Sequence, residues 1–159
     1  MQEVNVYHIR EKYLVYSTIL DISSEEIEEL KKNIVRYREE NPVSNTSNVK
    51  GWHSSYETWK NCSYFDSFIL KIMNECNEIL NDYNYTNVTR EMYNMWINMS
   101  EKGDYTINHC HKPTGYSCCF YVDVEENCSP IKFPPKLEIV PKNNMLILFG
   151  GNVYHEVPP

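Results

Sequence analysis

The chain has 159 residues, and 15 lysine and arginine residues against 22 aspartate and glutamate residues give a formal net charge of −7. This length is enough for one domain with its own core. The acidic balance, without a basic cluster, argues against a nucleic-acid partner. The chain has no apolar run of the roughly 18 residues that a transmembrane helix needs, so we expect no membrane partner.

The cysteines and the N-terminus bear on the cellular compartment. The first residues include Glu3 and lack an apolar segment followed by a cleavage site, so the sequence predicts no signal peptide. The chain has 6 cysteines and no Cys-x-x-Cys pair, a density well below that of a disulfide scaffold. We therefore expect reduced thiols and a cytoplasmic protein.

The first half of the chain is expected to form one or two strands and then two helices. Residues 4–20 have the β-branched and aromatic content of strands. Ser23 and Glu26 form a capping-box pattern that begins a helix, and Asn41-Pro42 ends it. A second amphipathic helix is predicted from about Tyr64 to Tyr83, with one apolar face. Both helices should lie against a sheet.

A polar loop is expected between the two helices, over residues 42–55. It carries Trp52 and His53, which have two interpretations. The two rings could overhang a pocket, or Trp52 could pin the loop to the core.

The second half of the chain consists of short predicted strands separated by turn residues. They cover residues 88–99, the segment of His109 and His111 between turns at 102–104 and 113–115, and then 116–124, 131–133, 137–140, 145–149 and 155–157. Such a series favours an antiparallel barrel or sandwich, and helices followed by strands favour one α+β domain.

Three of the 5 histidines form the most informative pattern in the sequence. In a strand, His109 and His111 would leave the same face, about 6–7 Å apart. His155 follows the apolar segment 145–149 and a glycine turn. A His-x-His pair with a distant histidine can hold a catalytic divalent metal with open coordination positions, and either zinc or iron suits it. The alternative for the pair alone is a polar strand surface.

Several short motifs resemble those of the Fe(II)/2-oxoglutarate oxygenases, in the same order. They are Trp96-Ile97-Asn98, Gly103-Asp104-Tyr105, residues 108–113, residues 117–122, Ile147-Leu148-Phe149 and residues 155–158. A phage and bacterial branch with a His-x-His-Pro motif is the most similar, and its Gly-Trp-x-Ser segment resembles residues 51–54. The resemblance covers about residues 45–159.

The resemblance implies a double-stranded β-helix, or jelly roll, of the cupin type with two N-terminal helices packed on it. In a single domain 1–159, residues 84–159 would form the jelly-roll core and residues 1–83 the support. It also implies a non-haem Fe(II), 2-oxoglutarate-dependent hydroxylase, with His109, His111 and His155 as iron ligands. The substrate, a protein side chain or a small metabolite, stays open.

The sequence departs from the family pattern at two points. The family usually has an acid where His111 stands; Asp104 is not assumed to replace it, and Glu156 is expected to face away from His155. The family also has an arginine on a last strand, which holds the distal carboxylate of 2-oxoglutarate, but the sequence ends at Pro159. The domain could be truncated, could bind 2-oxoglutarate poorly, or could use another anchor.

Tyr121 and Lys132 are the candidates for that other anchor, although Tyr121 could instead be a core tyrosine and Lys132 an exposed lysine. Two other functions stay open. One is a non-catalytic jelly-roll module that retains the histidines, and the other is a cupin-like dioxygenase that needs no keto acid.

Overall fold

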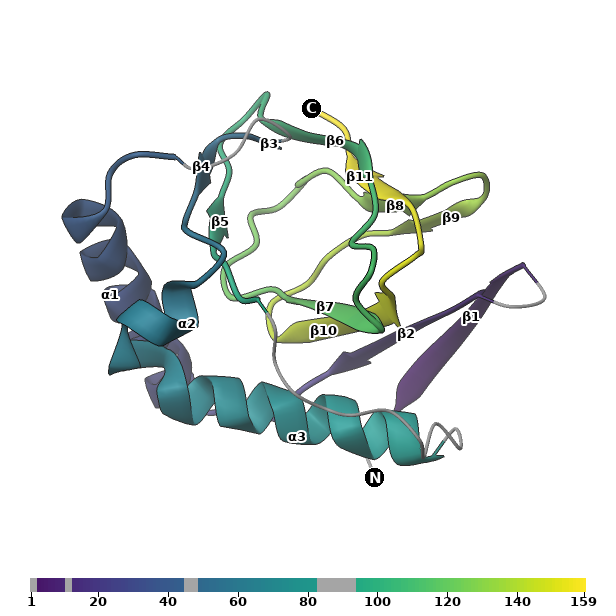
Figure 1. Ribbon diagram of the computed structural model, residues 1–159, viewed down its shortest axis with the longest axis horizontal. Helices are drawn as coiled ribbons and strands as arrows, with labels where there is room; N and C mark the ends of the chain where they lie inside the picture. Colours follow the sequence, from purple (N-terminus) through teal and green to yellow (C-terminus); the bar gives the residue numbers. More distant parts are fainter. Residues whose placement is uncertain (1–2, 11–12, 45–48, 83–93) are drawn as a thin grey trace.

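The computed structural model describes residues 3–10, 13–44, 49–82 and 94–159 (Figure 1). It has a mixed α+β architecture in which two antiparallel sheets enclose an apolar interior, as in a β-sandwich, and helices lie along one side. The predicted fold class is confirmed at this level. Among the described residues, no helix combines the length and apolarity needed to cross a membrane.

The first sheet joins the two ends of the chain. Its strand order is β1-β2-β10-β7. The strands are β1 (Val4–Arg10), β2 (Tyr13–Ile19), β10 (Met145–Gly150) and β7 (Tyr116–Phe120). Leu148 of β10 lies opposite Tyr16 on one side and Cys118 on the other. The N-terminal strands are therefore part of the sandwich, and the boundary at residues 83 and 84 does not separate support from sheet.

The second sheet has the order β3-β6-β11-β8-β9. Its strands are β3 (Val49–Lys50), β6 (Tyr105–His109), β11 (His155–Val157), β8 (Ile131–Phe133) and β9 (Leu137–Ile139). A small separate sheet pairs β4 (Trp52–His53) with β5 (Asn98–Met99). The first half of the predicted strand 88–99 lies outside the described residues, and its described half is regular strand only at β5.

The helices begin and end largely as the sequence predicts. Helix α1 (Ser24–Glu40) begins at a Ser23–Glu26 capping box and ends at Asn41. The second predicted helix is α3 (Asp66–Asp82), which begins later than expected. Two short helical turns precede it, α2 (Thr58–Asn61) and the 3₁₀ turn Ser63–Phe65.

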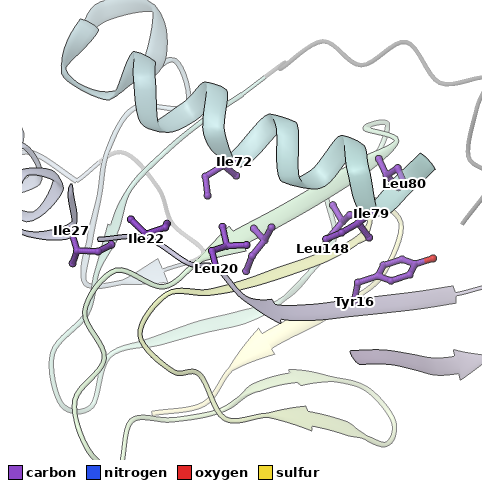
Figure 2. Close-up of a cluster of buried hydrophobic side chains, with 9 residues drawn as sticks. Tyr16, Leu20, Ile22, Ile27, Ile72, Ile79, Leu80 and Leu148 are labelled. Atoms are coloured by element: carbon purple, nitrogen blue, oxygen red, sulfur yellow. The ribbon is translucent and has the colours of Figure 1, made fainter. Parts of the chain in front are cut away.

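Strand β10 is the centre of the core because it is covered on both faces. Leu146 and Leu148 belong to one buried cluster with Ile72 and Ile79 of α3. Figure 2 shows Leu148 directed toward this helix. Ile147 and Phe149 face the other way, into the interior between the two sheets. A strand buried on both faces is apolar throughout rather than alternating, which explains the run Met145–Phe149. The six cysteines are all free thiols.

Candidate metal centre

Three histidines from different parts of the second sheet and its loops meet at the interior. His109 ends β6, and His155 begins β11 directly opposite it. His111 lies two positions beyond the end of β6, in a turn. One ring nitrogen of each histidine lies within 4.8 Å of the others. The structure therefore brings together all three histidines that the sequence singled out.

His109 reaches the interior because β6 contains a bulge. His155 lies opposite His109 and Val157 opposite Thr106, so three steps along β6 match two steps along β11. The extra residue shifts the alternation of side chains. Ile107 remains on the outer face, where it is 51% exposed, whereas His109 faces inward. Because His111 lies beyond the end of β6, simple i, i+2 alternation, from which we expected His109 and His111 to share a face, is not what brings their rings together.

The position of His111 is set by the glycine turn after β10. The His111 N–H donates to the Gly151 carbonyl at 2.7 Å, and the Gly151 N–H donates to the Gly115 carbonyl at 3.0 Å. A Cβ at position 151 would overlap Thr114, including its backbone carbonyl. Glycine thus allows the two loops to approach closely enough to hold His111 beside the other two histidines.

Hydrogen bonds at Nδ1 fix two of the three rings in the tautomer that a metal requires. Nδ1 of His109 lies 2.8 Å from the Ile107 carbonyl, and Nδ1 of His155 lies 3.1 Å from the Val153 carbonyl. A carbonyl only accepts, so each Nδ1 carries the proton and donates it. The lone pair is left on Nε2, as in protein metal sites where a second partner orients the ligand histidine.

His111 differs because its partner is a hydroxyl. Its Nδ1 lies 2.7 Å from Ser117 Oγ, which can donate or accept. Its Nε2 lies 3.1 Å from Nε2 of His109. Without a metal, His111 can donate from Nε2 to His109 while Ser117 donates to Nδ1. With a metal on both Nε2 atoms, the bond to His109 is lost, the proton of His111 moves to Nδ1, and Ser117 accepts from it.

The spacing of the rings suits a divalent ion. Two nitrogens bound to one metal at about 2.1 Å are separated by roughly 3.0–3.4 Å for octahedral to tetrahedral angles. The Nε2 atoms of His109 and His111 already have that separation, 3.1 Å. The ring of His155 lies 4.4 Å from that of His109 and 4.8 Å from that of His111, centroid to centroid. Small ring rotations therefore bring all three nitrogens onto one ion.

Burial keeps His111 and His155 in the ligand state at neutral pH. Burial, with His109 nearby, lowers the pKa of His111 to about 4. Burial and the neighbouring histidines lower the pKa of His155 to about 3, against the opposing effect of the Val153 carbonyl. Both rings are neutral near pH 7, so a metal does not have to displace protons from them.

Aromatic rings surround the centre. The Phe149 ring lies 4.7 Å from that of His155, and Phe133 lies 5.2 Å from Phe149. On another side, Trp96 makes an edge contact with His111 at 5.3 Å. These rings shield the centre from water and lower the local dielectric constant.

No carboxylate joins the three histidines among the described residues. Asp104 accepts from the Glu101 N–H at 2.8 Å, and Lys50 lies 3.9 Å from it. Glu156 is paired with Lys132 across β11 and β8, on the face away from His155, as expected. The candidate ligand set consists of three neutral imidazoles.

The two proposed anchors for a co-substrate carboxylate have different surroundings. Lys132 alternates with the buried Ile131 and Phe133, and its ammonium bonds to Glu138 at 2.8 Å on the outer face. Tyr121 packs against the interior cluster, and burial raises the pKa of its hydroxyl. The ion pair with Glu138 engages Lys132 on the outer face. The role of Tyr121 as an anchor stays a prediction.

The structure decides between the two interpretations of Trp52 and His53. Trp52 pins its loop to α1, because its Nε1–H donates to the Asn41 carbonyl at 3.0 Å. His53, the next residue, faces the other way and stacks on Trp96 at 5.7 Å. Burial lowers the pKa of His53, with a further contribution from His109. In the sequence, only the Gly-Trp-His-Ser segment indicated that His53 could lie near the centre.

Comparison of the chain with models of protein families, with curated proteins and with solved structures finds no match. What this centre can do is therefore decided by its own side chains.

Proposed function

We propose that this protein is a non-haem Fe(II) oxygenase that uses 2-oxoglutarate and has His109, His111 and His155 as its metal ligands. The observation that carries the proposal is the common orientation of these three histidines. In two of them a backbone carbonyl binds Nδ1, and the Nε2 atoms of His109 and His111 lie 3.1 Å apart. Imidazole ligands suit iron as well as zinc.

The order of the strands adds support for the double-stranded β-helix. From β6 to β11 the chain changes sheet at every connection except the one between β8 and β9: β6, β8, β9 and β11 belong to one sheet, β7 and β10 to the other. Such alternation is typical of double-sheet jelly rolls, including cupins. In this proposed topology, the metal ligands lie at one end of the jelly-roll interior.

The chain's own residues have defined tasks in this proposal. Fe(II) with 2-oxoglutarate would supply the oxidative chemistry that hydroxylates a substrate. The Ile107 and Val153 carbonyls and the Ser117 hydroxyl hold the three ligands in place. Phe133 and Phe149 exclude water from behind His155. Three neutral ligands leave the centre one unit more positive than two histidines and a carboxylate would, which favours an anionic co-substrate on the metal.

The second candidate function is a non-catalytic jelly-roll module that binds a metal such as zinc. It is favoured by the absence of a carboxylate ligand among the described residues and by the ion pair of Lys132 with Glu138, which leaves the distal carboxylate of 2-oxoglutarate without this anchor. A dioxygenase that needs no keto acid has the same ligand set and is an outcome of the same test.

The test is an anaerobic titration of the metal-free protein with Fe(II), followed by 2-oxoglutarate. We expect one Fe(II) per chain and then a visible charge-transfer band when the keto acid chelates the iron. Fe(II) binding without the band would exclude 2-oxoglutarate and leave an oxygenase without a keto acid. Binding of Zn(II) but not of Fe(II) would favour the non-catalytic module. His155→Ala is the control, and it should bind neither metal tightly.

A further inference from the structure

Tyr56, His53 and Trp96 form a continuous wall of rings beside the metal centre, here named the ring wall. His53 stacks on Trp96 with an angle of 15° between the ring planes and a centroid distance of 5.7 Å. Tyr56 makes edge contacts with both, at 5.0 and 5.4 Å. Trp96 in turn contacts His111 at 5.3 Å. Since Tyr56 is 40% exposed, the ring wall leads from the surface to a metal ligand.

Backbone hydrogen bonds fix the ring wall in place. The Ser54 N–H donates to the Ile97 carbonyl at 2.9 Å, and the Met95 N–H donates to the Tyr56 carbonyl at 3.0 Å. Ser54 Oγ also accepts from the Ile97 N–H at 2.8 Å. The segments that carry the three rings are thus joined across the small β4–β5 sheet, and the rings are preorganised.

His53 supplies one polar atom in this wall. The side chain is only 2% exposed, and its Nδ1–H donates to the Ser54 carbonyl at 2.5 Å. The carbonyl cannot donate, so Nε2 of the neutral ring carries a lone pair and is an acceptor. Among the described residues Nε2 has no hydrogen-bond partner. The buried side-chain atoms that lack a hydrogen-bond partner do not include this Nε2, so it is not closed to solvent.

Because Nε2 is not closed to solvent, its hydrogen bond can come from water or from a bound molecule that replaces that water. His53 is not one of the three grouped ligands, but His109 is close enough to influence its charge. Neutral His53 therefore offers an open acceptor on the same ring wall that contacts the candidate ligand His111 through Trp96.

We propose that the ring wall is the substrate-binding side of the metal centre, and that Nε2 of His53 accepts a hydrogen bond from an O–H or N–H group of the bound molecule. The substrate class is a planar or largely apolar molecule with such a donor near its metal-bound end, since aromatic faces bind flat apolar groups. This inference rests on the proposed metal centre, but not on the identity of the metal or on 2-oxoglutarate.

The test compares two probes that differ by one donor. Imidazole and N-methylimidazole both bind Co(II) through one nitrogen, but only imidazole then presents an N–H. Each is titrated into the Co(II)-loaded full-length protein, and binding is followed by the visible Co(II) spectrum. One hydrogen bond should make the wild type prefer imidazole by roughly three- to tenfold.

Two variants assign that preference to His53. His53→Phe keeps a ring for stacking on Trp96 but has no acceptor, so the ratio of the two probe affinities should fall toward one. His53→Gln keeps an acceptor and should retain part of the preference. Both variants should bind one Co(II) per chain with the wild-type affinity, because His53 is not a ligand.

The outcomes separate this inference from the proposed function. An equal probe ratio in wild type and His53→Phe, with Co(II) bound normally, would overturn the role of His53 alone. Loss of Co(II) from His53→Phe, with a wild-type melting temperature, would make His53 a ligand and also overturn it. Failure of the wild type to bind Co(II) would overturn the metal centre and this inference with it.

Discussion

Ser117 Oγ lies 2.7 Å from Nδ1 of His111, so a hydroxyl on β7 orients a candidate metal ligand that belongs to neither sheet. His109 and His155 depend on backbone carbonyls of nearby residues, which no substitution removes. Ser117 is therefore the only one of the three partners that mutation can delete. Its hydroxyl can also reverse its hydrogen bond when a metal binds, which a carbonyl cannot do.

Ser117→Ala should weaken metal binding without preventing it. Loss of an outer partner of a ligand histidine typically lowers metal affinity by about 10- to 100-fold, and we expect a decrease in this range for Co(II) or Zn(II). Calorimetric titration of the metal-free protein measures it. Ser117→Thr retains the hydroxyl and should stay near the wild type. An unchanged affinity in Ser117→Ala would mean that His111 is not held through Nδ1.

Replacements of His111 should follow the reach of the new side chain. Nε2 of His111 is the atom near His109, and Nδ1 is taken by Ser117. A glutamate oxygen reaches about as far as Nε2, whereas an aspartate oxygen ends near the present position of Nδ1. We therefore expect anaerobic Fe(II) affinity to decrease from His111→Glu to His111→Asp to His111→Ala. Equal affinity of all three variants and the wild type would remove His111 from the site.

The metal-free protein should lose stability in mild acid. The pKa values of His155 and His111 are lowered to about 3 and about 4 in the folded state, from 6.5. Between these values and 6.5 the unfolded chain binds more protons than the folded one, so the free energy of unfolding falls as pH drops below about 6.5. Above that pH the two histidines have no such effect.

Urea unfolding at pH 7 and pH 5, with a chelator present, measures this loss. His155→Gln cannot titrate at this position, so its free energy of unfolding should decrease less between the two pH values. An equally large decrease in His155→Gln would mean that groups other than His155 cause the acid sensitivity.

The sequence was most informative where a local pattern of residues determines the structure. The capping box of Ser23 and Glu26 located the start of α1, and the apolar run Met145–Phe149 identified a strand covered on both faces. These features depend on local patterns, namely a cap spaced by three residues and a continuous buried strand. The three histidines of the site were likewise found from residue type and spacing.

The sequence was less informative where contacts between distant segments decide. The bulge between Thr106 and His109 exists only because β6 pairs with β11, and no residue type within β6 predicts it. The partner of His53 is Trp96, more than forty positions away. Lys132 was a plausible anchor by position, but its direction depends on the register of β8, which places it beside Glu138.

Gly151→Ala tests whether the approach of two loops sets the metal centre. A Cβ at this position would overlap Thr114 Oγ1 and the Thr114 carbonyl, and the backbone carbonyl cannot rotate away. Such overpacking costs about 1–3 kcal/mol of stability, and it should also displace His111, whose N–H donates to the Gly151 carbonyl. We expect a lower melting temperature and weaker Co(II) binding.

The neighbouring glycine provides the matched control for Gly151→Ala. A Cβ at Gly150 would meet only side-chain atoms, the nearest being Oδ1 of Asn152 at 3.0 Å. Because the exposed end of Asn152 can move, Gly150→Ala should change stability and Co(II) affinity much less. Wild-type Co(II) affinity in Gly151→Ala would show that His111 reaches the metal without this loop contact. Equal losses in the two variants would point to a general effect on β10 instead of a specific one on His111.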